Sequence, residues 1–458
     1  MIFMYLALYT ALLIITVYVG IKTYRELVNP ISIWASLWSA IGILSNLAFY
    51  GYNKPLNYVN AVITIGIIVH TLFCVYYHDK CWTRRDRGPL HMDEISVNLD
   101  MRMFLLINIA AICFEIPFLI RSLIILVQNN FDMAYLRAAM TNAENGVISG
   151  GLISIIRDSG VRNVFTMSAL YASFLIFTKQ AGRDNRKVIV IAIAEMLIYC
   201  CSNAARAYAV NFIFYLLLVL FLCNSRNILE VLRKNLKLVL LFVLLVAVIL
   251  GVQLLRSPEM PILKTFYVYY CSGPAYLSEL LKDPYVVVQV DEDFRYGTAT
   301  FGFLANFYYY IKTALTGIND STVKLLSSVI TTRQYKVGDH AYINAMCTGF
   351  YAFLVDWGTL GAIIGPLVTG WFSSHYYKRM KQRRTIGQVV ICVYVFYCMI
   401  RTVFKWDLLY IDFIVLLVLN GLICSGPGIR ACSDRVFDFL DSTVGRKVRL
   451  WVRKNESS

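Results

Sequence analysis

The chain has 458 residues, of which 58% are hydrophobic and 16% charged, and its mean hydropathy is +0.61. Soluble globular domains carry about 25% charged residues, so this composition excludes a single water-soluble fold. The formal net charge of +15 does not indicate a nucleic-acid partner, because the basic residues lie in short segments between long apolar runs.

Apolar runs recur from the beginning of the chain to its end. A transmembrane helix needs about 20 predominantly apolar residues, so the sequence predicts an all-α integral membrane protein with about 11 transmembrane helices, and residues 1–458 form a single polytopic membrane domain. The predicted spans lie near 2–21, 31–50, 58–77, 104–127, 163–178, 188–201, 208–223, 238–255, 352–372, 386–400 and 411–424.

The distribution of basic residues predicts the orientation of these spans. Six segments hold 27 of the 43 Lys and Arg residues: 22–25, 80–87 with Arg102, 179–187, 226–237, 378–384 and 430–454. Basic loops face the cytoplasm, so we expect a periplasmic N-terminus, a basic cytoplasmic tail at 425–458, and a large periplasmic loop at 256–346 between spans 8 and 9. The first run is followed by Lys22 and Arg25 rather than by a small-residue cleavage site, so we interpret it as a span and not as a signal peptide.

Some segments and cysteines permit two interpretations. Residues 300–314 are apolar but interrupted by polar side chains, which favours a helix lying at the membrane interface, and residues 147–156 are a second candidate. Most of the twelve cysteines fall in predicted spans or on the cytoplasmic side, where a thiol acts as a small apolar group. A disulfide between Cys271 and Cys347 stays open. No Cys/His spacing indicates a metal site.

The large outer loop contains the densest group of chemically active side chains. Within eight residues it has Arg333, Lys336, Asp339 and His340. One interpretation is a solvated turn. The other is a cationic pocket for an anionic headgroup, in which His340 or Asp339 moves a proton near neutral pH. His340 is the only one of the five histidines that the predicted topology places in an outer loop.

Further candidates lie where spans meet the outer face. Arg206 occupies a tight turn between two spans, where an arginine either snorkels or binds an anion. Arg121 invites the same interpretation more weakly. Arg295 follows an acidic triplet at 291–293, which we interpret as a solvated turn. Asp356 begins Asp-Trp-Gly-Thr-Leu-Gly at the mouth of the ninth span and is placed to orient nearby groups.

Two carboxylates, Glu115 and Glu195, fall inside predicted spans. Buried carboxylates serve proton coupling in some membrane proteins, but hydrogen bonding between helices is their commoner role. Tyrosine and phenylalanine are abundant, with 31 and 27 residues. Aromatic belts at the membrane interface account for most of them, although rings near the outer face also fit a carbohydrate groove.

The chain as a whole resembles the Wzy-type O-antigen and capsule polysaccharide polymerases of bacterial inner membranes. The resemblance covers nearly the whole plan of spans and the large late outer loop. It includes the turn with Arg206 and three local stretches: Asn-Pro-Ile-Ser-Ile-Trp from Asn29, Tyr-Gly-Thr-Ala-Thr-Phe-Gly from Tyr296, and Asp-Trp-Gly-Thr-Leu-Gly from Asp356. It implies a glycosyltransferase architecture of the GT-C-like kind, with the active site on the periplasmic side.

The resemblance also implies a substrate. Such a polymerase joins oligosaccharide repeat units carried on undecaprenyl diphosphate, without metal or other cofactor. Arginines are needed to hold the departing lipid diphosphate, and a base must take the proton of the acceptor hydroxyl. For the diphosphate and glycan we expect Arg121, Arg206, Arg295, Arg333, Lys336 and Asp356, and for the base His340 or Asp339.

Partners and rival functions follow from the same resemblance. A Wzz-type chain-length regulator and a Wzx-type flippase are the expected partners in the same membrane, and no nucleic acid is expected. An O-antigen ligase would have a similar plan, with a late outer loop bearing arginines and a histidine. A repeat-unit flippase or transporter is the non-enzymatic alternative, which the long outer loop disfavours.

Overall fold

The computed structural model describes most of the chain in several stretches. The described residues are 2–82, 90, 92–141, 153, 156–177, 183–223, 240, 243–247, 249–251, 261–282, 297–316, 334–339, 342–343 and 347–424. Half of the predicted eighth span at 238–255 and most of the candidate interface segment at 147–156 lie outside them.

Helices make up nearly all the regular structure of the described residues. They are α1 (Ile2–Tyr24), α2 (Pro30–Leu47), α3 (Asn57–Cys81), α4 (Met101–Gln128), α5 (Met133–Thr141), α7 (Arg162–Leu175), α8 (Arg183–Asn203), α9 (Ala207–Cys223), α12 (Ile262–Cys271), α13 (Gly273–Leu280), α15 (Gly302–Thr316), α17 (Thr348–Trp357), α18 (Gly361–Arg383), α19 (Ile386–Arg401) and α20 (Asp412–Ile423). Single turns are η1 (Phe49–Gly51), η3 (Met92–Glu94), η4 (Ile156–Val161), η5 (Gly358–Leu360) and η6 (Asp407–Leu409), and the strands are β1 (Tyr335–Lys336) and β2 (Tyr342–Ile343).

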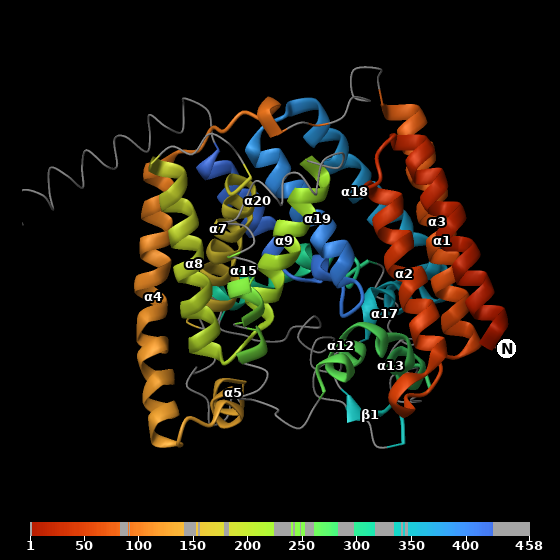
Figure 1. The fold of residues 1–458 in the computed structure, drawn as a ribbon, viewed down its shortest axis with the longest axis horizontal. Helices are drawn as coiled ribbons and strands as arrows, with labels where there is room; N and C mark the ends of the chain where they lie inside the picture. The colour runs from red at the N-terminus through yellow and green to blue at the C-terminus, as the bar shows by residue number, and fades with distance from the viewer. Residues whose placement is uncertain are drawn as a thin grey trace, which may run out of the picture.

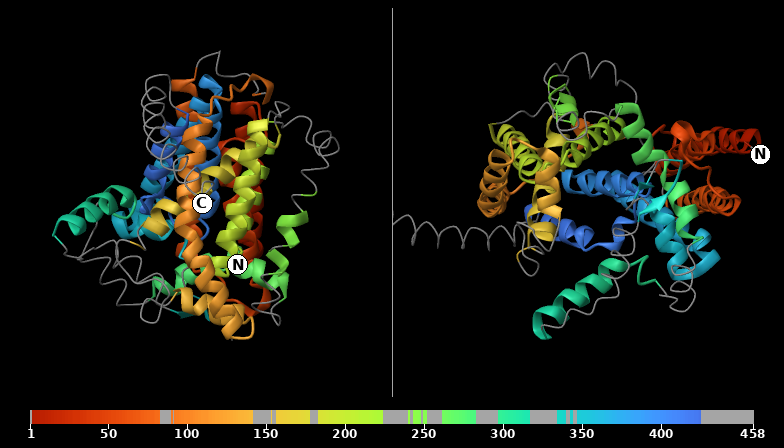
Figure 2. Two further views of the ribbon diagram at one scale, coloured as in Figure 1. Left: turned by 90° about the vertical axis from the view of Figure 1, so that its left-hand side faces the viewer. Right: turned by 90° about the horizontal axis from the view of Figure 1, so that it is seen from below.

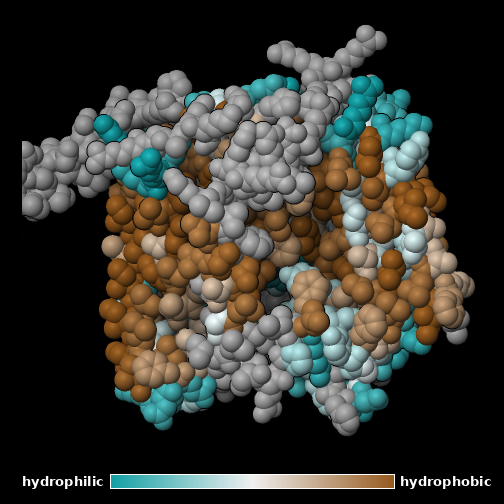
Figure 3. Space-filling model, viewed as in Figure 1, coloured by the Kyte–Doolittle hydropathy of each residue, from teal (hydrophilic) through white to brown (hydrophobic). Residues whose placement is uncertain are grey.

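The long helices have the length and composition of membrane spans. Five stretches of the described chain are long and apolar enough to cross a bilayer: α1, α2, α3, α4 and Thr348–Arg383, which contains α17 and α18. Helices α9, α19 and α20 are shorter but apolar. Figure 3 shows a broad hydrophobic band between hydrophilic upper and lower edges. The prediction of an all-α protein is confirmed, and the helices are consistent with an integral multi-pass membrane protein; the sidedness stays a prediction.

The helices form one upright bundle (Figure 1). Helices α1, α2 and α3 stand at one side and α18 packs on α3, while α4 stands at the opposite edge and packs on α8. Between these groups, α7, α9 and α19 contact one another, and α20 packs on α7 and α19. One end of the bundle holds the ends of α8 and α19 and the beginnings of α7, α9 and α20. Helix α12 also lies toward this end (Figure 1), so we call it the α12 end.

Polar residues fix where several helices begin. Asn29 precedes α2, and its side-chain oxygen accepts a hydrogen bond from the amide of Ser32 at 2.9 Å. Asp100 caps α4 in the same way and accepts the amides of Arg102 and Met103 at 3.1 Å each. Both residues satisfy amides that a helix cannot satisfy internally.

The predicted ninth span at 352–372 is two helices rather than one. Helix α17 ends at Trp357, and Gly358 follows with φ 55° and ψ −139°, a backbone conformation that only glycine adopts readily. Helix α18 continues from Gly361 to Arg383. The prediction missed this break, because the run on both sides of Gly358 is equally apolar.

Two further elements lie outside the upright bundle (Figure 2). Helix α15 lies across the direction of the long helices (Figure 2), and it overlaps the segment predicted as an interfacial helix. Strands β1 and β2 pair antiparallel and form a hairpin below α13 (Figure 1). Cys271 and Cys347 are both buried free thiols, so they do not form a disulfide.

Candidate functional site

Three of the predicted site residues lie outside the described residues. They are Arg295, Arg333 and the predicted base His340. Their assignment to diphosphate binding and proton transfer therefore stays a prediction from the sequence.

Lys336 and Asp339 belong to a hairpin that is docked on the turn between α2 and α3. The amide of Asn53 donates to the carbonyl of Val337 at 2.7 Å, and the amide of Asp339 donates to the carbonyl of Gly51 at 3.3 Å. Lys336 pairs with Tyr342 across the hairpin. The side chains of Lys336 and Asp339 are exposed. Strand β1, which contains Lys336, lies below α13 beside the α1–α3 group and away from the α8–α9 turn that carries Arg206 (Figure 1).

Arg206 lies where the sequence predicts it, in the tight turn between α8 and α9. Its guanidinium lies over the ring of Tyr269 on α12, with the central carbon 5.3 Å from the ring centroid. This cation–π contact joins the α8–α9 turn to α12. Arg206 is half-buried, so the turn holds it within the protein surface rather than extended into solvent.

A second group of cations lies at the end of α19 and in the loop after it. Arg401 Nε is 3.3 Å from Asp407 Oδ2, and Lys405 Nζ is 3.9 Å from Asp407 Oδ1. Asp407 Oδ2 is buried and has no hydrogen-bond partner among the described residues. Lys405 Nζ also lies 3.8 Å from the centroid of the Tyr410 ring. Arg401 and Lys405 thus both pair with the Asp407 carboxylate, but neither donates a hydrogen bond to its Oδ2 atom.

Arg162 adds a cation from the beginning of α7. Its guanidinium donates to Asp412 Oδ2 at 2.5 Å, and Asn163 donates to Asp412 Oδ1 at 2.9 Å. Arg162 and Asp412 both interact electrostatically with Lys405, so this pair and the α19 group adjoin one another. The half-buried ring of Tyr270 interacts electrostatically with both Arg401 and Arg206.

Electrostatic interactions link Arg162, Arg401 and Lys405, and the rings of Tyr269 and Tyr270 link Arg206 to them; we call these four residues the cationic cluster. The side chains of Arg162, Arg401 and Lys405 are 34%, 28% and 27% exposed, whereas those of Asp412 and Asp407 are only 12% and 5% exposed. These three cations are therefore partly exposed, whereas the carboxylates that they contact are buried. Figure 3 shows a hollow in the molecular surface between the lower part of α9 and α12.

Lys405 has a pKa well below the ordinary value for lysine. Burial and the neighbouring Arg401 lower the pKa of Lys405 to about 8, and Asp407 opposes that shift only in part. An incoming anion would stabilise the charged form of this lysine. The cluster is thus suited to an anion that arrives with several negative charges.

A fully closed ion pair supports the turn that carries Arg206. The guanidinium of Arg157 in η4 donates twice to Glu115 of α4, at 2.9 Å and 2.5 Å, and the two side chains are 2% and 0% exposed. Ser202 donates to the same carboxylate at 2.7 Å and lies immediately before the α8–α9 turn. This confirms hydrogen bonding between helices for Glu115.

Asp356 positions backbone rather than facing solvent. Its buried carboxylate accepts the amides of Ala299 and Thr300. The indole of Trp406 donates to the carbonyl of Thr300 at 2.6 Å, and that of Trp357 donates to its hydroxyl at 3.2 Å. Trp406 follows Lys405 in the loop between α19 and α20, which we call the cationic loop. Asp356 therefore holds the 297–301 turn in the position where it contacts this loop. This geometry favours a positioning role for Asp356 over direct contact with a glycan.

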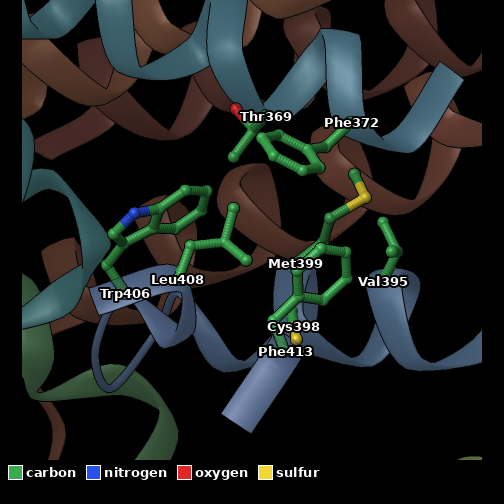
Figure 4. A pocket seen from close by; sticks show the side chains of 8 residues that line it. All are labelled: Thr369, Phe372, Val395, Cys398, Met399, Trp406, Leu408 and Phe413. Atoms are coloured by element: carbon green, nitrogen blue, oxygen red, sulfur yellow. The ribbon is translucent and has the colours of Figure 1, made fainter. Parts of the chain in front are cut away.

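An apolar pocket holds the other side of the cationic loop. Trp406 and Leu408 point toward side chains of α18 and α19, as Figure 4 shows. The pocket is lined by Thr369, Phe372, Val395, Cys398, Met399, Trp406, Leu408 and Phe413. Because it carries no charged group, we interpret it as the anchor of the loop and not as the place where an anion binds.

The remaining predicted cation, Arg121, lies apart from the cluster. It is exposed on α4, which stands at the edge of the bundle (Figure 1). Within the described stretches no group of three or more His, Cys, Asp or Glu side chains could hold a metal ion. Comparison with known proteins finds no matching family model, no matching curated protein and no matching solved structure.

Arg162, Arg401, Lys405 and Asp407 were missed in the sequence. The signal was present, because Arg-Thr-Val-Phe-Lys-Trp-Asp at 401–407 places three charges in a short loop at a predicted membrane edge, where charges are costly unless they have a role.

Proposed function

We propose that the protein is a membrane glycosyltransferase that polymerises undecaprenyl-diphosphate-linked oligosaccharide repeat units into O-antigen or capsular polysaccharide on the periplasmic face of a bacterial inner membrane. The observation that carries the proposal is the convergence of Arg162, Arg206, Arg401 and Lys405 from α7, the α8–α9 turn and the α19 loop. A lipid diphosphate is an anion that several cations can hold at once.

The proposed reaction makes one bond and breaks one. A hydroxyl oxygen of the acceptor repeat unit bonds to the anomeric carbon of the donor glycan, and the bond from that carbon to the diphosphate oxygen breaks. The electron pair leaves with undecaprenyl diphosphate, and the hydroxyl proton passes to a base. The cationic cluster would stabilise the charge that develops on the leaving diphosphate. His340 stays the proposed base, whereas Asp339 is held at the α2–α3 turn, apart from Arg206, and is the weaker candidate.

The deciding experiment supplies the purified full-length protein with one substrate only. That substrate is the lipid-linked repeat unit extracted from cells in which the gene is deleted. A polymerase produces carriers with two, three and more repeat units and releases undecaprenyl diphosphate, which a gel and mass spectrometry detect. A ligase makes product only when a separate lipid acceptor is added. A flippase makes no new glycosidic bond, and either of these results would contradict the proposal.

The proposed sidedness has its own test. Reporter fusions after Lys282, which follows α13, and after Arg84, in the basic segment after α3, should report opposite sides of the membrane, with Lys282 outside. Reporter activity on the same side for both positions would contradict the orientation, whatever the enzymatic assay gives.

A further inference from the structure

Helix α12 presents aromatic rings next to the cationic cluster. Phe266 and Tyr270 stack with their centroids 4.6 Å apart, and Tyr270 meets the edge of Phe404 at 5.1 Å. Tyr269 also meets Phe404, at 6.5 Å. We call these four residues the α12 aromatic face. All four are at least partly exposed, and Phe266 is 56% exposed.

The α12 aromatic face is continuous with the cations. Tyr269 lies beneath the guanidinium of Arg206 at 5.3 Å, and Phe404 is the neighbour of Lys405 in sequence. Burial raises the pKa of Tyr270 to about 12, although Arg401 and Arg206 act to lower it. Its hydroxyl therefore stays protonated at neutral pH and remains a hydrogen-bond donor.

These contacts distinguish the face from an ordinary aromatic belt. Rings of a membrane belt turn their faces to lipid and their polar tips to the headgroups. Here one ring face is occupied by Arg206 and another phenol lies within electrostatic reach of two arginines. The rings accordingly border the place where an anion would be held.

We infer that the α12 aromatic face binds the sugar ring that is bonded directly to the diphosphate, the reducing-end sugar of the lipid-linked oligosaccharide. The inference rests on the proposed function. A sugar attached through one anomeric oxygen cannot lie far from the phosphate that the cations hold. Aromatic rings pack on the apolar C–H face of a pyranose, and the phenol hydroxyls donate to its oxygens.

The test compares two ligands that differ only in the presence of sugar. Full-length protein in lipid nanodiscs is titrated with undecaprenyl diphosphate and with the extracted lipid-linked repeat unit. Tyr269→Ala should weaken binding of the repeat unit about tenfold, the size of one lost ring contact, and leave undecaprenyl diphosphate within about twofold. Tyr269→Phe keeps the ring but loses one hydroxyl donor, so it should weaken the repeat unit less than Tyr269→Ala does and leave undecaprenyl diphosphate within about twofold.

Control variants distinguish a failure of sugar binding by the α12 aromatic face from a failure of the proposed function. Phe266→Ala removes a ring that is 56% exposed, so it should fold normally and weaken only the repeat unit. Tyr308→Ala removes an exposed tyrosine of α15 and should change neither affinity. Equal weakening of both ligands by Tyr269→Ala would mean that Tyr269 only positions Arg206, and unchanged binding of both would likewise overturn the inference. If the parent protein binds neither ligand, the proposed function itself is wrong.

Discussion

Two groups of ion-pairing residues lie near the α12 end of the bundle and differ in how their charges are satisfied. Between α4 and η4, Arg157 and Glu115 are 2% and 0% exposed, and Ser202 donates to the same carboxylate. Around Asp407, by contrast, Arg401 and Lys405 are 28% and 27% exposed, and one oxygen of the carboxylate has no hydrogen-bond partner among the described residues.

This difference indicates that the first group stabilises the fold and that the second can bind a ligand. A buried pair whose hydrogen bonds are all made has nothing left to offer a ligand, and removing one partner leaves an uncompensated charge. A group with more cations than its carboxylate can satisfy, and with the cations toward solvent, retains attraction for an anion. We therefore expect substitutions in the first group to damage the fold and those in the second to damage activity.

The largest effect should come from opening the closed pair. Arg157→Ala leaves Glu115 buried without its partner, which typically costs about 3–5 kcal/mol. We expect a large loss of folded protein in detergent, measured by the thermal midpoint and by the yield of monodisperse material. Replacing both partners, as Arg157→Met with Glu115→Leu, removes the buried charge altogether and should restore most of that loss. Equal instability of the single and double variants would contradict this account.

We call Arg401, Lys405 and Asp407 the open group. Arg401→Ala removes one of its cations and should lower the catalytic rate. Removing one group that stabilises a developing anion costs about 10²- to 10³-fold in rate, while a residue 28% exposed should tolerate truncation with little change in the thermal midpoint. Arg401→Lys should rescue activity only in part, because lysine lacks the planar fork that holds two phosphate oxygens. The measurement is polymer formation by purified protein at matched concentration. A loss of folded protein that parallels the loss of rate would remove the contrast with Arg157.

The sequence predicts the helices well because long apolar runs leave the chain no alternative in a membrane. Predicted spans at 2–21, 58–77 and 104–127 fall on α1, α3 and α4. The turn that carries Arg206 was also evident, since only a few residues separate two apolar runs. What the sequence could not reveal is which loops meet. Arg162 and Lys405 are far apart in the chain, and they join only because α7 and α20 pack together.

The sequence also could not show which distant segments contact Lys336, Asp339 and Asp356. A high local density of charges at 333–340 suggested a pocket, but the hairpin places Lys336 and Asp339 on the α2–α3 turn instead of beside Arg206. Asp356 was recognised as an orienting residue, yet its partners, the amides of Ala299 and Thr300, come from a segment more than fifty residues away.

Asp356→Asn should have an intermediate effect, because it weakens the support of the open group without removing a cation. One of the two carboxylate oxygens becomes an amide nitrogen that faces a backbone N–H, which costs about 1–3 kcal/mol. Hydrogen exchange of the Ala299 and Thr300 amides should accelerate about tenfold or more, since 1.4 kcal/mol is a factor of ten in opening. Asp100→Asn is a matched control, because asparagine caps a helix as well as aspartate. Unchanged exchange at Ala299 and Thr300 would contradict the positioning role.

The smallest expected effect is a dependence of anion affinity on pH, which tests whether Lys405 contributes to the open group. Because burial and Arg401 lower the pKa of Lys405 to about 8, the cluster loses one positive charge as the pH rises through that value, whereas Arg162 and Arg401 remain charged. The charged groups that act on Lys405 are Arg401, Arg162, Asp407 and Asp412. Binding an anion raises the pKa of Lys405, so affinity for undecaprenyl diphosphate should fall as the pH rises above about 8, by at most tenfold per pH unit for one proton. Lys405→Arg should abolish this dependence, because a guanidinium stays charged throughout. A parent protein whose affinity is flat between about pH 7 and pH 10 would show that Lys405 does not meet the anion, and the open group would then consist of the arginines alone.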